Sequence, residues 1–193
     1  MDRYYWLHLA NYAWIAFLVY WLVSARKLKS IKRREPSAER VIYLAFMVVT
    51  YLLMFNDRLN FQWLGQRFVA PTRAIGAIGV AITVAGVAFA IWARAHLGEN
   101  WSATVTVKQG HQLIRTGPYG RVRHPIYTGI MFGLAGTAVA LGEYRGLLSL
   151  AMAGVCFYLK ARKEERYLVQ EFGEGFKEHL AQTGMFFPKF TQP

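Results

Sequence analysis

The sequence is poor in cysteine and in acidic residues. Cys156 is the single cysteine among 193 residues, and it lies in an apolar run. This excludes a disulfide within the chain and a metal site built on cysteines, and we expect Cys156 to be buried as a small hydrophobe. Aspartate and glutamate number 11 against 23 lysines and arginines, a net charge of +12. So basic a chain is expected to meet an anionic partner, either nucleic acid or a membrane surface.

Charge is also scarce within five long apolar blocks, and 54% of the chain is hydrophobic. Blocks of this length are typical of bilayer-spanning helices, although a soluble four-helix bundle with very apolar helices is an alternative. Nucleic-acid binding would need basic and aromatic residues on one soluble face, whereas here the basic residues lie between the blocks. We therefore predict an all-α integral membrane protein of about five transmembrane helices, forming one domain over residues 1–193. The expected spans are 4–23, 41–55, 73–95, 125–141 and 146–161.

The distribution of lysine and arginine predicts how these spans are oriented. The stretches 24–40, 94–124 and 160–193 carry seven, five and six of them, while 56–72 and 142–145 carry two and one. Since cytoplasmic loops collect positive charge, we expect the N-terminus outside and the C-terminus in the cytoplasm. The first block lacks a basic leader and a small-residue cleavage site, so we interpret it as a retained span. In a bacterium the membrane would be the cytoplasmic (inner) membrane.

Two polar regions lie on the predicted cytoplasmic side. The first, 96–124, is too long for an ordinary connection; His96 would cap or line it, and the pattern of 104–110 favours a small hairpin. The second, 163–182, repeats an apolar residue every fourth position and predicts an amphipathic helix, weakened by two glycines. That helix would lie on the membrane surface or pack onto the protein's own cytoplasmic loop.

The segment GPYGRVRHPIYTG, residues 117–129, is a polar and turn-rich sequence directly before the fourth block. Pro125 suits the first turn of a helix, which places His124 near its N-cap. The free amides of that turn, the helix dipole and Arg123 together predict an anion site. A basic loop at the membrane edge, anchored at the headgroups by Tyr119 and Tyr127, is the alternative interpretation.

The fifth block ends in ARKEERY, which places Glu164 and Glu165 beside that segment if the two helices form a hairpin. Two carboxylates among four basic residues form either a solvated salt-bridge network or a cation site. A cation site next to an anion site would suit a zwitterion. The amino-acid portion of S-adenosylmethionine is such a group.

These residues, taken in order, resemble the signature of the isoprenylcysteine carboxyl methyltransferase family, which belongs with the membrane phospholipid methyltransferases. The likeness is dense over residues 96–190 and generic before them. The chain resembles a compact prokaryotic member, since it lacks the extra N-terminal spans of the eukaryotic enzymes. The motifs that carry it are Leu97-Gly98-x-Asn100-Trp101-Ser102, Gly110-His111-x-Leu113-x-x-x-Gly117-x-Tyr119, Arg123-His124-Pro125-x-Tyr127-x-Gly129, Glu164-Glu165, Glu171-Phe172-Gly173 and Gly184-x-x-Phe187-Pro188.

The resemblance implies a membrane methyltransferase that binds S-adenosylmethionine from the cytosol, releases S-adenosylhomocysteine and uses no metal. Its cofactor site is not a Rossmann fold, and no G-x-G-x-x-G follows a strand here. The catalytic candidates that it implies are Arg123, Arg162 and Glu165, the two arginines orienting a substrate or cofactor carboxylate. The cofactor-binding candidates are His111, Gly117, Tyr119, His124, Pro125, Tyr127, Glu164 and Glu165.

The methyl acceptor stays open at this point. The family implies a lipophilic acceptor such as a prenylcysteine carboxylate, which is ionised at neutral pH and needs no base. A lipid amine or a small thiol would first have to lose a proton to a glutamate or histidine. A non-catalytic transporter or scaffold is the alternative from another class, although transporters usually carry charges within their spans. The expected partners are the bilayer and the lipophilic substrate, with no nucleic acid and an undetermined oligomeric state.

Overall fold

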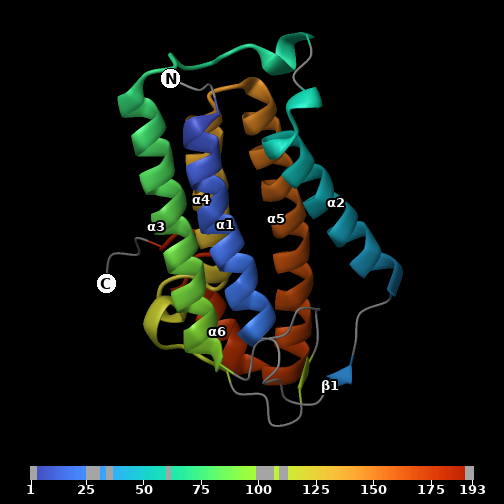
Figure 1. The fold of residues 1–193 in the computed structure, drawn as a ribbon. Helices are drawn as coiled ribbons and strands as arrows, with labels where there is room; N and C mark the ends of the chain where they lie inside the picture. Colours follow the sequence, from blue (N-terminus) through green and yellow to red (C-terminus); the bar gives the residue numbers. More distant parts are fainter. Residues whose placement is uncertain are drawn as a thin grey trace.

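The computed structural model of the chain describes residues 4–24, 31–33, 37–59, 62–98, 107–108 and 113–189. Long helices run side by side and form a bundle (Figure 1), which confirms the predicted helical architecture. The elements are α1 Tyr5–Ser24, β1 Ile31–Arg33, α2 Ser37–Phe55, η1 Asp57–Leu59, η2 Gln62–Gly65, α3 Arg73–Leu97, β2 Val107–Lys108, η4 Gly117–Gly120, α4 Pro125–Leu141, α5 Tyr144–Phe172 and α6 Glu174–Gln182.

The short strand in the polar region after α3 pairs with a segment that is distant in the sequence. Strand β2 pairs antiparallel with β1, which precedes α2 in the chain. The other residues of the predicted 104–110 hairpin lie outside the described residues, as does His111. This pairing connects the loop after α1 to the loop after α3 at the end of the bundle where α6 also lies (Figure 1).

Helices α3 and α4 pack at very close range because small residues face each other. A Cβ atom placed on Gly86 would lie 2.4 Å from the amide nitrogen of Gly133, and one on Gly129 would lie 2.6 Å from that of Ala90. Gly129 and Gly133, four residues apart on α4, therefore form a packing motif of the kind common between membrane helices. Close approach of two backbones fixes α4, whose first residue is Pro125, against α3.

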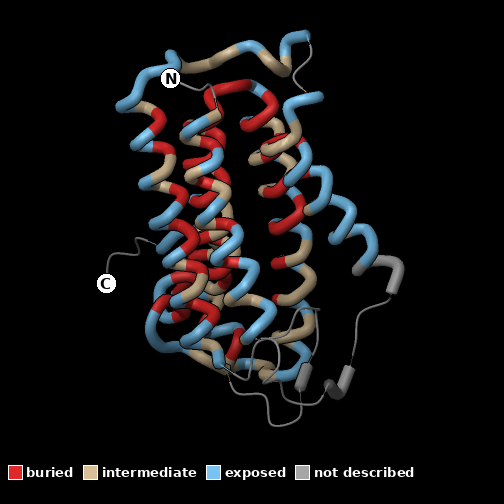
Figure 2. Tube along the Cα trace, in the orientation of Figure 1, coloured by how far each residue is buried: buried red, intermediate tan, exposed pale blue. Residues whose placement is uncertain are grey.

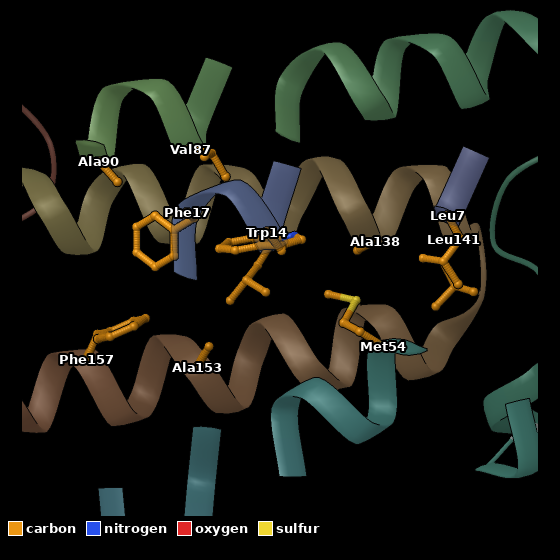
Figure 3. Packing of buried hydrophobic residues seen from close by; sticks show 11 residues of the cluster. Leu7, Trp14, Phe17, Met54, Val87, Ala90, Ala138, Leu141, Ala153 and Phe157 are labelled. Carbon is orange, nitrogen blue, oxygen red and sulfur yellow. The ribbon is translucent and has the colours of Figure 1, made fainter. Parts of the chain in front are cut away.

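Larger side chains fill the space between this pair and the other helices (Figure 3). Trp14 of α1 is buried and donates its indole N–H to Thr137 Oγ1 on α4 at 2.9 Å. Met54 of α2 and Phe157 of α5 enter the same core. Figure 2 shows buried residues along α4 and on the facing sides of its neighbours, whereas α2 is largely exposed. The core is thus centred on α4.

Many large apolar side chains point away from this core. Two of the described helices, α1 and α3, are long and apolar enough to cross a membrane, and 41–55 and 125–141 form shorter apolar helices. Exposed leucine, valine, isoleucine and aromatic residues occur along α1, α2, α3 and α5. An outer surface of this composition suits hydrocarbon better than water. The count of five spans and their orientation stay predictions.

The C-terminal region differs from the single amphipathic helix predicted over 163–182. Helix α5 continues without interruption to Phe172 and ends at Gly173, which has a φ of 53°. Helix α6 then begins, and it buries Phe176 and His179, which are 2% and 4% exposed. Since the buried face of α6 packs against the rest of the protein, the structure favours the packing alternative over a helix lying on the membrane surface.

Candidate functional site

The segment before α4 is held in place by the backbone that follows α6. Val122 forms a parallel bridge with Gly184, and the amides of Arg123 and His124 donate to the carbonyls of Gly184 at 2.9 Å and Met185 at 3.1 Å. The Thr128 hydroxyl donates to the carbonyl of Phe186 at 2.8 Å. Two segments far apart in the sequence therefore fix the position of the first turn of α4.

Arg123 connects this turn to α5. Its Nε lies 2.7 Å from Glu165 Oε1, and its Nη1 donates to the carbonyls of Thr183 and, at 3.5 Å, Leu180. The positive charge that was expected to bind a substrate or cofactor carboxylate is thus already paired within the chain. The role predicted for Arg123 in orienting a ligand stays a prediction, and its visible role is to hold the site together.

His124 lies between the two adjacent carboxylates of α5. Its Nδ1 is 3.4 Å from Glu164 Oε2, and its Nε2 is 3.3 Å from Glu165 Oε1. Burial opposes a charge on the ring, but hydrogen bonds and charge from both glutamates outweigh it and raise the pKa of His124. Burial likewise opposes ionisation of the glutamates, yet His124 lowers the pKa of each. The pairing of His124 with both carboxylates thus favours the charged form of its ring.

Aromatic rings form one wall beside these charges. Tyr127 donates its hydroxyl to Glu164 Oε1 at 2.5 Å. Its ring stacks on His124, with centroids 5.5 Å apart, and on Phe157, with centroids 4.8 Å apart. Lys160 Nζ lies 5.8 Å from the centroid of the Tyr127 ring. The faces of such rings attract cations, as does the 22% exposed side chain of Glu164.

Tyr119 supplies a polar group that lacks a partner. Its side chain is buried, and its hydroxyl has no hydrogen-bond partner within the described residues. Burial raises the pKa of Tyr119, and the charge of Glu164 adds to this effect, so the hydroxyl keeps its proton. A buried donor without an acceptor is costly, so a ligand that accepts from Tyr119 would relieve that cost.

His96 at the end of α3 supports the segment that carries Tyr119. Its ring stacks on Tyr119 with centroids 6.4 Å apart, and its Nε2 lies 2.9 Å from Thr116 Oγ1. Gly117 has a φ of 57° and touches the same ring so closely that a Cβ would lie 2.7 Å from His96 Cε1. Glycine is therefore needed at position 117 for both its conformation and its contact.

The structure thus gathers most of the predicted site residues at one end of the bundle. His124, Tyr127, Glu164 and Glu165 are in direct contact, and Arg123 and the helix-starting Pro125 adjoin them. Arg162 is exposed and makes no ion pair with either glutamate. Within the described ranges, no group of three or more histidine, cysteine, aspartate or glutamate residues is arranged to hold a metal ion.

Arg94 is a site residue that sequence reasoning did not identify. It is 3% exposed and donates to the carbonyls of Gly98 at 2.9 Å and Ser24 at 3.0 Å. Its charge also interacts with Tyr119. A lone arginine near the end of an apolar helix was the available signal. A charged side chain in a membrane-spanning helix costs free energy, so it usually serves a function.

Comparison with known structures and sequences defines the class of protein. The structure of a eukaryotic intramembrane Ras methyltransferase, isoprenylcysteine carboxyl methyltransferase, superposes with a TM-score of 0.55 and 21% identity, over 80% of this chain and 53% of that one. This shows a shared fold. The isoprenylcysteine carboxyl methyltransferase (ICMT) family profile matches residues 78–170. Through these residues, the chain is similar to that family.

Curated relatives extend the likeness to bacteria and yeast. The cobalt-zinc-cadmium resistance protein CzcN of Cupriavidus metallidurans is 26% identical over 147 residues, which is 75% of this chain and 62% of that protein. The Protein-S-isoprenylcysteine O-methyltransferase of Schizosaccharomyces pombe is 32% identical over 85 residues, 42% of this chain and 36% of that protein. The chain thus spans less than two thirds of the length of each of these relatives.

Proposed function

We propose that the protein is an integral membrane methyltransferase that uses S-adenosylmethionine to methylate a lipophilic carboxylate. The observation that carries this proposal is the contact of His124 and Tyr127 with Glu164, close to the unpartnered hydroxyl of Tyr119. Similarity to the family, whose yeast relative is named as an O-methyltransferase, supports it. The N-terminus would lie outside and the C-terminus in the cytoplasm, which places this cluster at the cytosolic end.

The residues at the cluster fit the amino-acid and sulfonium portion of S-adenosylmethionine. Glu164 offers a partly exposed carboxylate to a cation, and the faces of Tyr127 and Phe157 offer a second cation-attracting surface. Tyr119 offers a hydrogen-bond donor in a dry environment. When bound there, S-adenosylmethionine would supply a methyl group on positively charged sulfur, and Glu164, Tyr119 and the faces of Tyr127 and Phe157 would hold its amino-acid and sulfonium portion.

The protonation state of the cluster favours a carboxylate acceptor. Their mutual pairing raises the pKa of His124 and lowers the pKa of both glutamates, so the glutamates are weakened as bases. An amine or a thiol would need a base. A carboxylate is already ionised at neutral pH and needs only alignment and exclusion of water. A lipophilic acceptor would reach this end of the bundle from the bilayer, and the cofactor from the cytosol.

Calorimetric titration of the detergent-purified protein with S-adenosylhomocysteine tests the cofactor assignment. Glu164→Gln should weaken binding by about 10- to 100-fold, because a hydrogen bond to a charged group contributes about 1.5–3 kcal/mol. Tyr119→Phe should weaken it by about 3- to 10-fold, as expected for a neutral hydrogen bond. Glu174→Gln is the matched control, since that carboxylate lies on α6 and pairs with Lys177 at 2.6 Å.

If all three variants bind S-adenosylhomocysteine equally well, the placement of the cofactor is contradicted. If the folded wild-type protein does not bind S-adenosylhomocysteine, the methyltransferase proposal is contradicted. The acceptor is tested by comparing methyl transfer to an S-prenylated N-acetylcysteine with transfer to its carboxamide and to a phosphatidylethanolamine. We expect transfer to the acid alone, at a rate that hardly changes between about pH 6 and 8, because carboxyl groups titrate near pH 4.

A further inference from the structure

A cavity of about 560 Å³ lies at the end of the bundle opposite the ionic cluster. It is enclosed by the start of α1, the start of α3, the end of α4 and the segment between η2 and α3, which meet at that end in Figure 1. The residues that matter for its chemistry are Trp6, Arg67, Thr72, Ile75, Gly76 and Val139.

The polar side chains that line this cavity offer donors. Trp6 has its indole nitrogen buried without a hydrogen-bond acceptor in the described part of the chain. The indole lies directly on Gly76, where a Cβ would be 2.5 Å from the same nitrogen. Arg67 donates its Nε to the carbonyl of Val69 at 3.3 Å, and the structure gives its Nη groups no acceptor among the described residues. A ligand with acceptor oxygens would satisfy both side chains.

The start of the 25-residue helix α3 adds further donors on the same wall. Thr72 caps this helix by accepting from the amide of Ile75 at 3.2 Å, and its carbonyl accepts from the amide of Gly76 at 3.1 Å. The amides of Arg73 and Ala74 precede the first intrahelical bond, so they are orphan donors at the positive end of the helix dipole. Together with Arg67, they make this wall electropositive.

No acidic side chain is among the residues that line the cavity. The carboxylate of Glu143, whose backbone bridges that of Arg67, is fully buried in an ion pair with Arg145 at 2.7 Å. The remaining wall is apolar and includes Ile75, Val139 and the Trp6 ring. The cavity thus combines an anion-binding side with a hydrocarbon-compatible side.

We propose that this cavity binds the phosphate group of an anionic ligand, with a phospholipid headgroup as the source and its acyl chains lying along the apolar wall. Arg67 and the Trp6 indole would donate to the phosphate oxygens at the start of α3. In a bundle that crosses the bilayer, this end meets the headgroups of the leaflet opposite the ionic cluster. The site is separate from the proposed active site and does not depend on its chemistry.

Native mass spectrometry of the detergent-purified full chain tests the proposal with three probes: phosphatidylglycerol, phosphatidylcholine and inorganic phosphate. We expect retained adducts with phosphatidylglycerol, and fewer with phosphatidylcholine, whose headgroup carries a compensating cation. Arg67→Gln should reduce phosphatidylglycerol binding at least 10-fold. Trp6→Phe, which removes the N–H donor and replaces the indole with a smaller aromatic ring, should reduce it about 3-fold. If Arg67→Gln and Trp6→Phe also reduce the adducts with inorganic phosphate, the site would be assigned to a soluble phosphate.

Arg58→Gln is the matched control, because it removes one arginine from an exposed position of η1 outside the cavity. It should leave adduct formation unchanged. Binding that is absent for all probes, or that Arg58→Gln lowers as much as Arg67→Gln, would overturn the proposal. Trp6→Phe keeps the test valid if Arg67→Gln does not fold, since an adduct insensitive to Trp6→Phe would also count against the site.

Discussion

Two ionic clusters lie at opposite ends of α5, and they differ in the side chains that surround their charges. At the start of the helix, Arg145 and Glu143 are both fully buried, with Nε and Oε2 at 2.7 Å. Arg145 Nη1 also donates to the carbonyls of Leu53 at 3.2 Å and Asn56 at 2.8 Å. This cluster joins the ends of α2, α4 and α5, and the exposed carboxylate of Asp57 lies at its edge, with Oδ1 3.7 Å from Arg145 Nη2.

The cluster near the other end pairs charges just as closely but leaves part of itself accessible. Glu165 is 10% exposed at its side chain and is paired with Arg123 at 2.7 Å, whereas Glu164 is 22% exposed. It also contains a histidine that sits between two acids, and it lies near the unpartnered Tyr119. The comparison teaches that neither ion pairing nor an unsatisfied donor alone marks a functional site, because Arg145 Nη2 also lacks a hydrogen-bond partner among the described residues. The histidine between two acids and the partly exposed Glu164 distinguish the second cluster.

The largest expected effect comes from breaking the fully buried pair. Arg145→Met removes the cation and leaves the carboxylate of Glu143 buried without it, which should destabilise the protein by about 3–5 kcal/mol. Thermal unfolding in detergent, followed by circular dichroism, measures the loss. Arg58→Met at the same end of the bundle should change stability little, since Arg58 is exposed. Equal unfolding temperatures for Arg145→Met and wild type would show that the first cluster does not stabilise the fold.

A smaller effect is expected at the second cluster. Glu165→Gln keeps a hydrogen-bonding group beside Arg123 and His124 but removes its charge, so we expect a destabilisation of about 1–3 kcal/mol. Glu164→Gln, at a more exposed carboxylate, should cost less stability than Glu165→Gln while affecting S-adenosylhomocysteine binding more. Unfolding temperature and calorimetric binding, measured on both variants, separate the two roles. The reverse ranking would assign the holding role to Glu164.

The smallest effect should be a pH dependence confined to the second cluster. Because the pKa of His124 is raised in the folded protein, its contribution is present below the ordinary value of 6.5 and is lost as pH rises through the folded pKa. The lowered pKa values of the glutamates act oppositely: their contribution is present above 4.5 and is lost as pH falls through the folded pKa. The unfolding temperature should therefore be highest between the folded pKa values of the glutamates and the folded pKa of His124, and it should fall at higher pH.

His124→Gln should remove the alkaline fall in unfolding temperature. His8→Gln should keep it, because His8 lies exposed on α1. A fall of the same size in the His124→Gln protein would assign the pH dependence to other groups.

The helical fold was predictable because apolar runs of bilayer length leave few alternatives to helices. The end of α5 was not, since its hydrophobic run stops near residue 161 while the helix continues to Phe172. Lysine, glutamate and arginine are good helix formers, so a change from apolar to polar residues marks the end of a hydrophobic face and not the end of a helix. Gly173 ends the helix, and its sequence signal was visible.

At the site, side chains were easier to predict than backbone partners. The resemblance placed His124 with Glu164 and Glu165, and the structure brings them into contact. The carbonyls of Thr183 and Gly184, which accept from Arg123, carry no signal in residue type because every residue has a carbonyl. Only the fold can show which of them lie within reach.

The bridge between Val122 and Gly184 also implies an order in which parts of the protein form during synthesis. Arg123 leaves the ribosome 60 residues before its acceptor Thr183. At about 5–20 residues per second, translation separates the two by about 3–12 s. During that interval the apolar run of α4 emerges while the turn before it still lacks its final acceptors. The chain therefore commits its hydrocarbon-facing helices first and completes its ionic cluster last, when the segment after α6 arrives.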